Sequence, residues 1–256
     1  MRLSRRWLSR RNLANVDDAR TVCPICGTYD SFVALSEWSR DDLTCTGCHN
    51  GSVPRERAVA LALRDYAPEW RMQRILECSP APRGISVELM RKARHYQAIN
   101  LFPDRPLGAV VNSVRNEDLE AMSFADSSFD VFVSLDVLEH VPHPETAVRE
   151  ISRVVTPNGF AFLTFPIRKH QVEPVIARAV ISDDGTLDHL AEPEWHGNPF
   201  SSDGSLVFTD FGYDVHQWLF EASGRNATVI RFADAQHGIV GELTDVCVLG
   251  PLVGAR

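Results

Sequence analysis

The chain from residue 74 onward alternates short apolar runs with amphipathic segments. This alternation is typical of β-α-β units, in which a parallel sheet carries helices on both faces. The predicted strands cover residues 74–79, 96–101, 110–114, 129–135 and 159–165, with two closing strands at 228–232 and 246–249. The predicted helices cover residues 85–94, 144–155 and 210–222. The pattern therefore predicts an α/β fold.

Two details refine this prediction. The helix at 144–155 repeats its apolar side chains on one face, and Gly159 is expected to end it. Residues 167–209 lose the regularity, because prolines, glycines and histidines recur there without an apolar period. We expect that segment to be an irregular insertion that covers the substrate.

Four of the six cysteines form two C-x-x-C pairs, Cys23 with Cys26 and Cys45 with Cys48, at the spacing of a zinc ribbon. Each pair can fold as a tight turn that points two thiolates at one metal. Four sulfur ligands leave no position for water, so we expect a structural zinc and not a catalytic one. Two disulfides are the alternative, which nothing in the sequence favours because nothing indicates an oxidising compartment. The other two cysteines lie in apolar strands and are expected to be buried.

The N-terminal third divides into three predicted parts. Residues 1–20 form a basic segment, which we interpret as a frayed or docked terminus because it lacks the apolar core of a signal peptide. Residues 21–53 form the ribbon, with strand-like content at 31–38. A helix that starts near Pro54 then opens the remaining domain, residues 54–256.

Composition excludes some classes of function. The formal net charge of −8 offers no overall basic field for nucleic acid or anionic lipid, so nucleic acid is a disfavoured substrate. No apolar run is long enough to span a bilayer, so no membrane partner is expected. We expect a cytoplasmic protein and leave a homodimer open.

Residues 118–142, DLEAMSFADSSFDVFVSLDVLEHVP, resemble the type 11 family of class I S-adenosylmethionine (SAM)-dependent methyltransferases. Residues 149–159 and 162–166 continue the likeness in order and spacing. A cysteine ribbon joined by an Arg-x-Arg helix, here Arg55 and Arg57, is similar to one bacterial branch of these enzymes. The resemblance implies a Rossmann-like sheet, SAM as cofactor and methyl transfer as the reaction.

The resemblance also implies which residues touch the cofactor, all at or just beyond the carboxyl ends of predicted strands. Those of the first loop would approach the methionine part, and those of the next strand ends would approach the ribose and the adenine. The implied contacts are Glu77, Cys78, Ser79, Asn100, Leu101, Asp118, Leu119, Leu135 and Asp136. The chain departs from the family at Pro80 and Pro82, which replace loop glycines, and at Asn100, which replaces an acid.

Methyl transfer needs a positioned acceptor and, for many acceptors, a base. His140 is the first candidate, because it follows the strand whose end faces the methyl group in the family. His196, in the insertion, is the second, and Glu192 or Glu194 could orient it. His189 and Asp210 are further polar groups in or beside the insertion.

A divalent ion is a further interpretation of the same stretch. Asp136, Glu139 and His140 would share one face of a helix, an arrangement similar to the E-x-x-E-H metal site of ubiquinone-pathway O-methyltransferases. Magnesium would be the ion in that case. Many relatives without a metal carry the same L-E-H-V letters, so the metal-free alternative stays open.

The expected function is methyl transfer from SAM to an oxygen or nitrogen of a small metabolite, sugar or natural-product intermediate. Two alternatives remain. One is an RNA or protein methyltransferase that uses the ribbon for recognition. The other is a non-catalytic binding or assembly protein with the same fold, which the prolines of the first loop keep open. The ribbon itself could bind a partner, dimerise, or brace the helix that leads into the first strand.

Overall fold

The computed structural model describes residues 20–182, 184–198 and 201–254, so almost all of the predicted basic segment lies outside the described residues. Within them, an eight-stranded sheet has the order β16-β17-β8-β7-β3-β4-β6-β5. Its strands are β3 (Arg74–Cys78), β4 (His95–Asn100), β5 (Val110–Val111), β6 (Val114–Asn116), β7 (Phe129–Leu135), β8 (Val155–Thr164), β16 (Arg225–Ile230) and β17 (Val246–Leu252).

The pairing of the strands defines one special point in the sheet. Strands β6, β4, β3, β7 and β8 run parallel, whereas β17 is antiparallel to both β8 and β16. The strand order reverses between β3 and β7, because β3 pairs with β4 on one side and with β7 on the other. In open sheets of this kind a ligand binds beyond the carboxyl ends at such a reversal. The predicted α/β fold is confirmed, with both closing strands.

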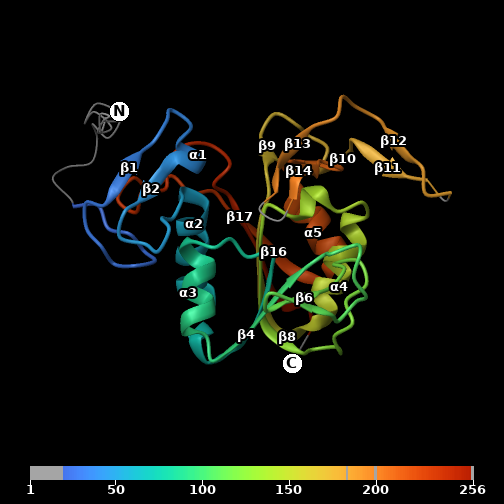
Figure 1. Ribbon diagram of the computed structural model, residues 1–256, viewed down its shortest axis with the longest axis horizontal. Helices are drawn as coiled ribbons and strands as arrows, with labels where there is room; N and C mark the ends of the chain where they lie inside the picture. Colours follow the sequence, from blue (N-terminus) through green and yellow to red (C-terminus); the bar gives the residue numbers. More distant parts are fainter. Residues whose placement is uncertain (1–19, 183, 199–200, 255–256) are drawn as a thin grey trace.

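Helices cover both faces of this sheet (Figure 1). Helices α2 (Pro54–Tyr66) and α3 (Gly84–Lys92) pack on one face, and α4 (Pro144–Val154) and α5 (Val215–Ser223) pack on the other. Successive strand residues point to opposite faces, so Ile75 joins one core and Leu76 the other. A short 3-10 turn, Trp70–Met72, leads from α2 into β3. No described helix is long and apolar enough to cross a membrane.

The N-terminal ribbon is a small hairpin with one helical turn. Strand β1 (Phe32–Ala34) pairs antiparallel with β2 (Leu43–Cys45), and α1 (Ser39–Asp42) connects them. Both C-x-x-C pairs flank this hairpin, as the sequence predicts. The ribbon lies beside the first turn of α2 and the loop that precedes β17 (Figure 1).

The insertion is more regular than its composition indicates. It contains the strands β9 (Ile167–Arg168), β10 (Val175–Ala177), β11 (Ala179–Ile181), β12 (Leu187–His189), β13 (Trp195–Asn198), β14 (Ser201–Leu206) and β15 (Thr209–Gly212). They form two hairpins and one three-stranded sheet. The expectation of irregular structure was wrong, because strands of two to six residues interrupted by glycine and proline leave no readable period.

Two predicted helix ends also differ from the structure. Helix α4 ends at Val154, and Gly159 lies inside β8, where an added Cβ would come within 2.5 Å of the Asp130 carbonyl oxygen. Gly159 therefore serves a close approach between strands and does not end the helix. The helix expected from residue 210 begins at Val215, because residues 209–212 form β15.

The first turn of α2 holds the ribbon on the domain. The Arg57 side chain is fully buried and donates hydrogen bonds to the carbonyl oxygens of Ser52, Leu43 (2.9 Å) and Gly238 (2.7 Å). Its guanidinium also lies 4.5 Å from the centre of the Phe32 ring. Burial lowers the pKa of Arg57 to about 10. One side chain thus links the ribbon, α2 and the loop before β17.

We expect Arg57→Met to lower the free energy of unfolding by about 3 kcal/mol, because several buried carbonyl groups lose their donor. The control is Arg64→Met on the same helix, whose side chain is 62% exposed; a change of about 0.5 kcal/mol or less is expected there. Chemical denaturation of both variants measures the difference. Equal effects from the two substitutions would contradict the role assigned to Arg57.

Candidate functional site

The four ribbon cysteines lie together in the arrangement of a metal site. The Sγ atoms of Cys23 and Cys48 are 3.6 Å apart, and those of Cys26 and Cys45 are 3.7 Å apart. A tetrahedral ion with metal–sulfur bonds of about 2.3 Å places its ligands about 3.8 Å apart. A disulfide would need about 2.05 Å. The spacing therefore fits a shared ion and not the alternative of two disulfides.

The second cysteine turn of the ribbon reaches the first loop of the α/β domain, between β3 and α3. Asn50 donates its side-chain amide to the Pro82 carbonyl at 2.8 Å, and the Gly84 amide points to the His49 carbonyl at 3.4 Å. Glu56 of α2 accepts a bond from Arg83 at 2.8 Å. An added Cβ at Gly84 would come within 2.0 Å of Glu56 Oε2, so only glycine fits this contact. The ribbon and α2 together position the loop.

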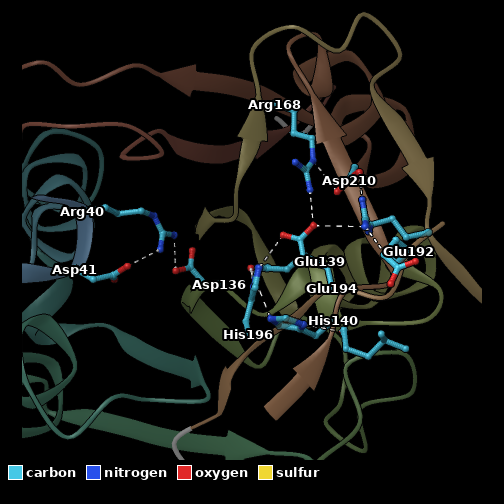
Figure 2. A network of polar contacts seen from close by, with 12 residues as sticks. Arg40, Asp41, Asp136, Glu139, His140, Arg168, Glu192, Glu194, His196 and Asp210 are labelled. Atoms are coloured by element: carbon cyan, nitrogen blue, oxygen red, sulfur yellow. Dashed lines mark hydrogen bonds and ion pairs between the residues drawn. The ribbon is translucent and has the colours of Figure 1, made fainter. Parts of the chain in front are cut away.

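A second contact joins the ribbon to the end of β7. The Asp136 carboxylate accepts a hydrogen bond from Arg40 of α1 at 2.6 Å and pairs with Arg55 Nε of α2 at 2.8 Å, and Thr164 donates to it at 3.0 Å. Figure 2 shows Asp136 between Arg40 and the side chains beyond β7. Burial would raise the pKa of Asp136, but the charges of Arg55 and Arg40 outweigh it, and the pKa is lowered.

Backbone conformation marks the same two strand ends. Ser79, directly after β3, has φ of 51°, and Asp136, directly after β7, has φ of 55°. Residues with side chains rarely adopt these values, and such strain gathers where a chain must present groups to a ligand. Both positions adjoin the reversal of strand order.

Several of the predicted cofactor contacts lie at neighbouring strand ends. Ser79 donates its hydroxyl to Asn100 Oδ1 at 2.6 Å, so the structure brings these two predicted residues together. Leu101 follows and is 50% exposed. Asp118, just beyond β6, is half-buried and accepts the Glu120 amide at 2.8 Å. Leu119 instead lies in the hydrophobic core.

The other predicted contacts of the first strand face inward. Glu77 is fully buried and accepts hydrogen bonds from Ser86 and from Tyr96, the latter at 2.7 Å. Burial, helped by the charge of Glu56, raises the pKa of Glu77 to about 7. Cys78 is also buried. The two hydrogen bonds of Glu77 link β3 to α3 and β4. Leu135, at the end of β7, packs partly buried against the core.

Beyond β7, the 3-10 turn Leu138–His140 and the insertion build a polar cluster. Glu139 Oε1 lies 3.8 Å from His140 Nε2 and 3.7 Å from His196 Nδ1. Glu139 is 1% exposed, and neither of its carboxylate oxygens has a hydrogen-bond partner among the described residues. Burial raises the pKa of Glu139, and the Glu139 carboxylate in turn raises the pKa of His196. The structure thus joins both predicted catalytic histidines around one buried carboxylate.

The insertion supports this cluster with a network of ion pairs (Figure 2). His196 Nε2 lies 3.3 Å from Glu194 Oε1, which confirms one of the two carboxylates expected to orient it. Glu194 pairs with Arg168 at 2.8 Å, and Asp210 pairs with Arg168 at 2.8 Å and Arg178 at 2.9 Å. Asp210 therefore stabilises the insertion through its ion pairs with Arg168 and Arg178.

One prediction about this region needs correction. Asp136, Glu139 and His140 do not share a helix face, because the turn after β7 is a single 3-10 turn and Asp136 turns to the arginines. His189 lies exposed in β12, outside the cluster. The sequence analysis did not predict that Arg40 and Arg55 contact Asp136. The available signal for Arg55 was the Arg-x-Arg pair at the start of a predicted helix.

Two surface hollows lie at the opposite edge of the sheet. One, of about 340 Å³, is lined by residues around the starts of β7 and β8, including Ser127 and Val155. The other, of about 450 Å³, lies at the starts of β3 and β4, including Arg74 and His95. Ligands of open parallel sheets bind at the carboxyl ends, so neither hollow is the candidate site.

Comparisons with known proteins show similarity to methyltransferases. The model of the methyltransferase domain family, type 11, matches residues 83–163. A methyltransferase of Mycobacterium sp. (strain KMS) with no characterised activity is 25% identical over 169 residues, which cover 62% of this chain and 65% of that relative. The match thus spans just under two thirds of the relative's length.

Solved structures show more distant likeness. A chain of the complex between the Haloferax volcanii Trm112 methyltransferase activator and its methyltransferase has a TM-score of 0.49 at 12% identity, covering 79% of this chain and 92% of that one. A SAM-dependent methyltransferase from Mesorhizobium loti has a TM-score of 0.46 at 17% identity, covering 75% and 96%. Neither likeness transfers residue roles to this chain.

The raised pKa of Glu77 predicts how stability depends on pH. Its value is 4.5 in the unfolded chain and about 7 in the folded one, so between these values the folded state holds a proton that the unfolded state has released. Stability therefore falls as pH rises through this window, by about 3 kcal/mol in total. Glu77→Gln keeps an acceptor for Ser86 and Tyr96 and should lose this slope. Melting temperatures from pH 4.5 to 7 measure it; parallel curves for the two proteins would refute the assignment.

Proposed function

We propose that this chain, whose residues 83–163 match the model of the type 11 methyltransferase domain family, transfers a methyl group from SAM to an oxygen or nitrogen of a small molecule. The observation that carries the proposal is the gathering of polar groups at the carboxyl edge of the sheet. Asn100 ends β4, Asp118 lies just beyond the neighbouring strand β6, and Glu139 with its two histidines lies beyond β7.

The side chains at this edge fit the nucleoside part of SAM. The Asn100 side-chain amide can form hydrogen bonds with the ribose hydroxyls. The Asp118 carboxylate can accept a hydrogen bond from the adenine amino group, because Asp118 Oδ2 makes no hydrogen bond within the described residues. The exposed Leu101 can cover the adenine ring. The loop at 80–83 offers fewer amide donors than a glycine-rich loop, since Pro80 and Pro82 have no N–H.

When bound, SAM supplies an electrophilic methyl group: the acceptor's lone pair forms the new bond to carbon as the sulfur–carbon bond breaks and sulfur keeps its electrons. The chain then needs to hold the acceptor and accept its proton. Glu139, His140 and His196 suit this work, because their side chains converge beyond β7 and together form a polar acceptor site.

The ribbon has a bracing role in this proposal. Its contacts to Pro82, Gly84 and Asp136 place it against the first loop and the end of β7. These contacts favour bracing over recognition of a large acceptor. We further propose that the four cysteines hold a structural zinc ion, on which the ribbon's fold depends.

Cofactor binding is tested by isothermal titration of SAM and S-adenosylhomocysteine. We expect the wild-type protein to bind both and Asp118→Ala to bind at least roughly tenfold more weakly, because a hydrogen bond to a charged group is lost. The control Asp65→Ala, on the outer surface of α2, should bind like the wild type. Absence of binding by the zinc-replete wild type would leave a non-catalytic protein of this fold.

Metal analysis tests the ribbon. We expect Cys45→Ser to hold about one zinc ion per chain fewer than the wild type, because three thiolates hold zinc more weakly than four. Cys247→Ser is the matched control, since Cys247 is buried in β17 outside the four-cysteine group, and it should keep the zinc content of the wild type. Equal zinc content in Cys45→Ser and the wild type, or an equal loss from both variants, would argue against the assignment.

A further inference from the structure

We propose that Glu139, His140 and His196 bind one divalent transition-metal ion, which holds an oxygen of the methyl acceptor. The proposal deepens the proposed function and rests on it for the role of the ion, but the binding of the ion can be tested without SAM or acceptor. It replaces the magnesium site expected from Asp136, because Asp136 is paired with Arg40 and Arg55.

The three side chains have the spacing of metal ligands. One possible ligand atom from each lies within 4.8 Å of the other two. Glu139 Oε1 is 3.7 Å from His196 Nδ1 and 3.8 Å from His140 Nε2, too far for a hydrogen bond. Two ligands that each lie about 2.1 Å from one ion are separated by roughly 3 to 4 Å. The gap among the three groups is therefore the size that an ion fills.

The Glu139 carboxylate is the second observation that points to a ligand. It is 1% exposed, and both of its oxygens lack a hydrogen-bond partner among the described residues. A buried carboxylate is rarely left without a partner, because the lost hydration is not replaced. A cation between Glu139 and the two imidazoles supplies the missing partner.

The outer nitrogens of both histidines are already occupied. His140 Nδ1 lies 2.8 Å from the Leu206 carbonyl oxygen, which can only accept, so Nδ1 carries the proton and Nε2 presents a lone pair. His196 Nε2 lies 3.3 Å from the Glu194 carboxylate, which leaves Nδ1 to face Glu139. Metal-binding histidines are typically oriented in this way by a carbonyl or carboxylate on the other nitrogen.

Two arginines hold Glu194, the residue that orients His196. Glu194 pairs with Arg168 at 2.8 Å and with Arg178 at 3.5 Å, so two arginines hold its carboxylate. The insertion thus delivers His196 from a braced position. Three acceptor groups that converge in this way repel one another unless a metal ion or a proton lies between them.

The ligand set selects the class of ion. Two imidazoles and one carboxylate suit zinc, manganese or iron better than magnesium, which prefers oxygen ligands. Three protein ligands leave coordination positions open, as in catalytic metal sites. An acceptor hydroxyl bound at such a position loses its proton more readily, so the inferred substrate class is a compound with an oxygen donor.

The test is isothermal titration of Mn²⁺, and separately of Zn²⁺, into protein whose ribbon is already filled with zinc, without SAM. We expect saturable binding of about one ion per chain for at least one of the two metals. Glu139→Gln and His196→Gln should each weaken it at least roughly tenfold. His189→Ala, an exposed histidine of the same insertion, is the control and should bind like the wild type.

The outcomes separate the proposal from its rival, a proton shared by Glu139 and His196. Absence of binding for both metals, or equal binding by Glu139→Gln and the wild type, overturns the metal site. In metal-free buffer Glu139→Gln should melt at a higher temperature than the wild type, because the substitution removes an unpartnered buried charge. If Glu139→Gln melts at a lower temperature than the wild type, the proposal is overturned and Glu139 instead forms a structural ion pair. The separate SAM titration tests the proposed function independently of the metal site, so the failure of one can be told from the failure of the other.

Discussion

Three consecutive side chains at the start of α2 join the parts of this protein. Arg55 pairs with Asp136 at the end of β7, Glu56 holds the first loop at Arg83, and Arg57 is buried in the ribbon. Such buried charges are stable only when every partner is in place, so each part constrains the others. The ribbon is too small for a core of its own, and this junction ties it to the sheet.

The junction at the start of α2 also places the ribbon against the candidate site. The carboxyl edge of the sheet lies between the ribbon on one side and the insertion on the other (Figure 1). The ribbon positions the first loop and Asp136, and the insertion positions His196. A site for cofactor and acceptor therefore depends on two additions to the α/β fold, one before its first strand and one after β8.

Local pattern was sufficient for much of this architecture. The strands at 74–78 and 129–135 are short segments rich in apolar residues, and α4 has a clear apolar stripe, so the hydrophobic pattern alone predicts their positions. The four cysteines were readable because metal geometry imposes their spacing. The insertion was not readable, because its strands are stabilised by pairing and by ion pairs such as Arg178 with Asp210, which leave no period in the chain.

The sequence by itself determined the α/β class and the four-cysteine group, because periodicity and ligand spacing are local properties, and the resemblance to a known family implied the candidate residues at strand ends. The tertiary structure alone decided which of those residues meet. Asp136 and Glu139 are three positions apart, yet one turns to Arg40 and Arg55 and the other faces His196. Residues far away in the chain determine these contacts, because a buried carboxylate pairs with whichever cation or hydrogen-bond donor the fold places next to it.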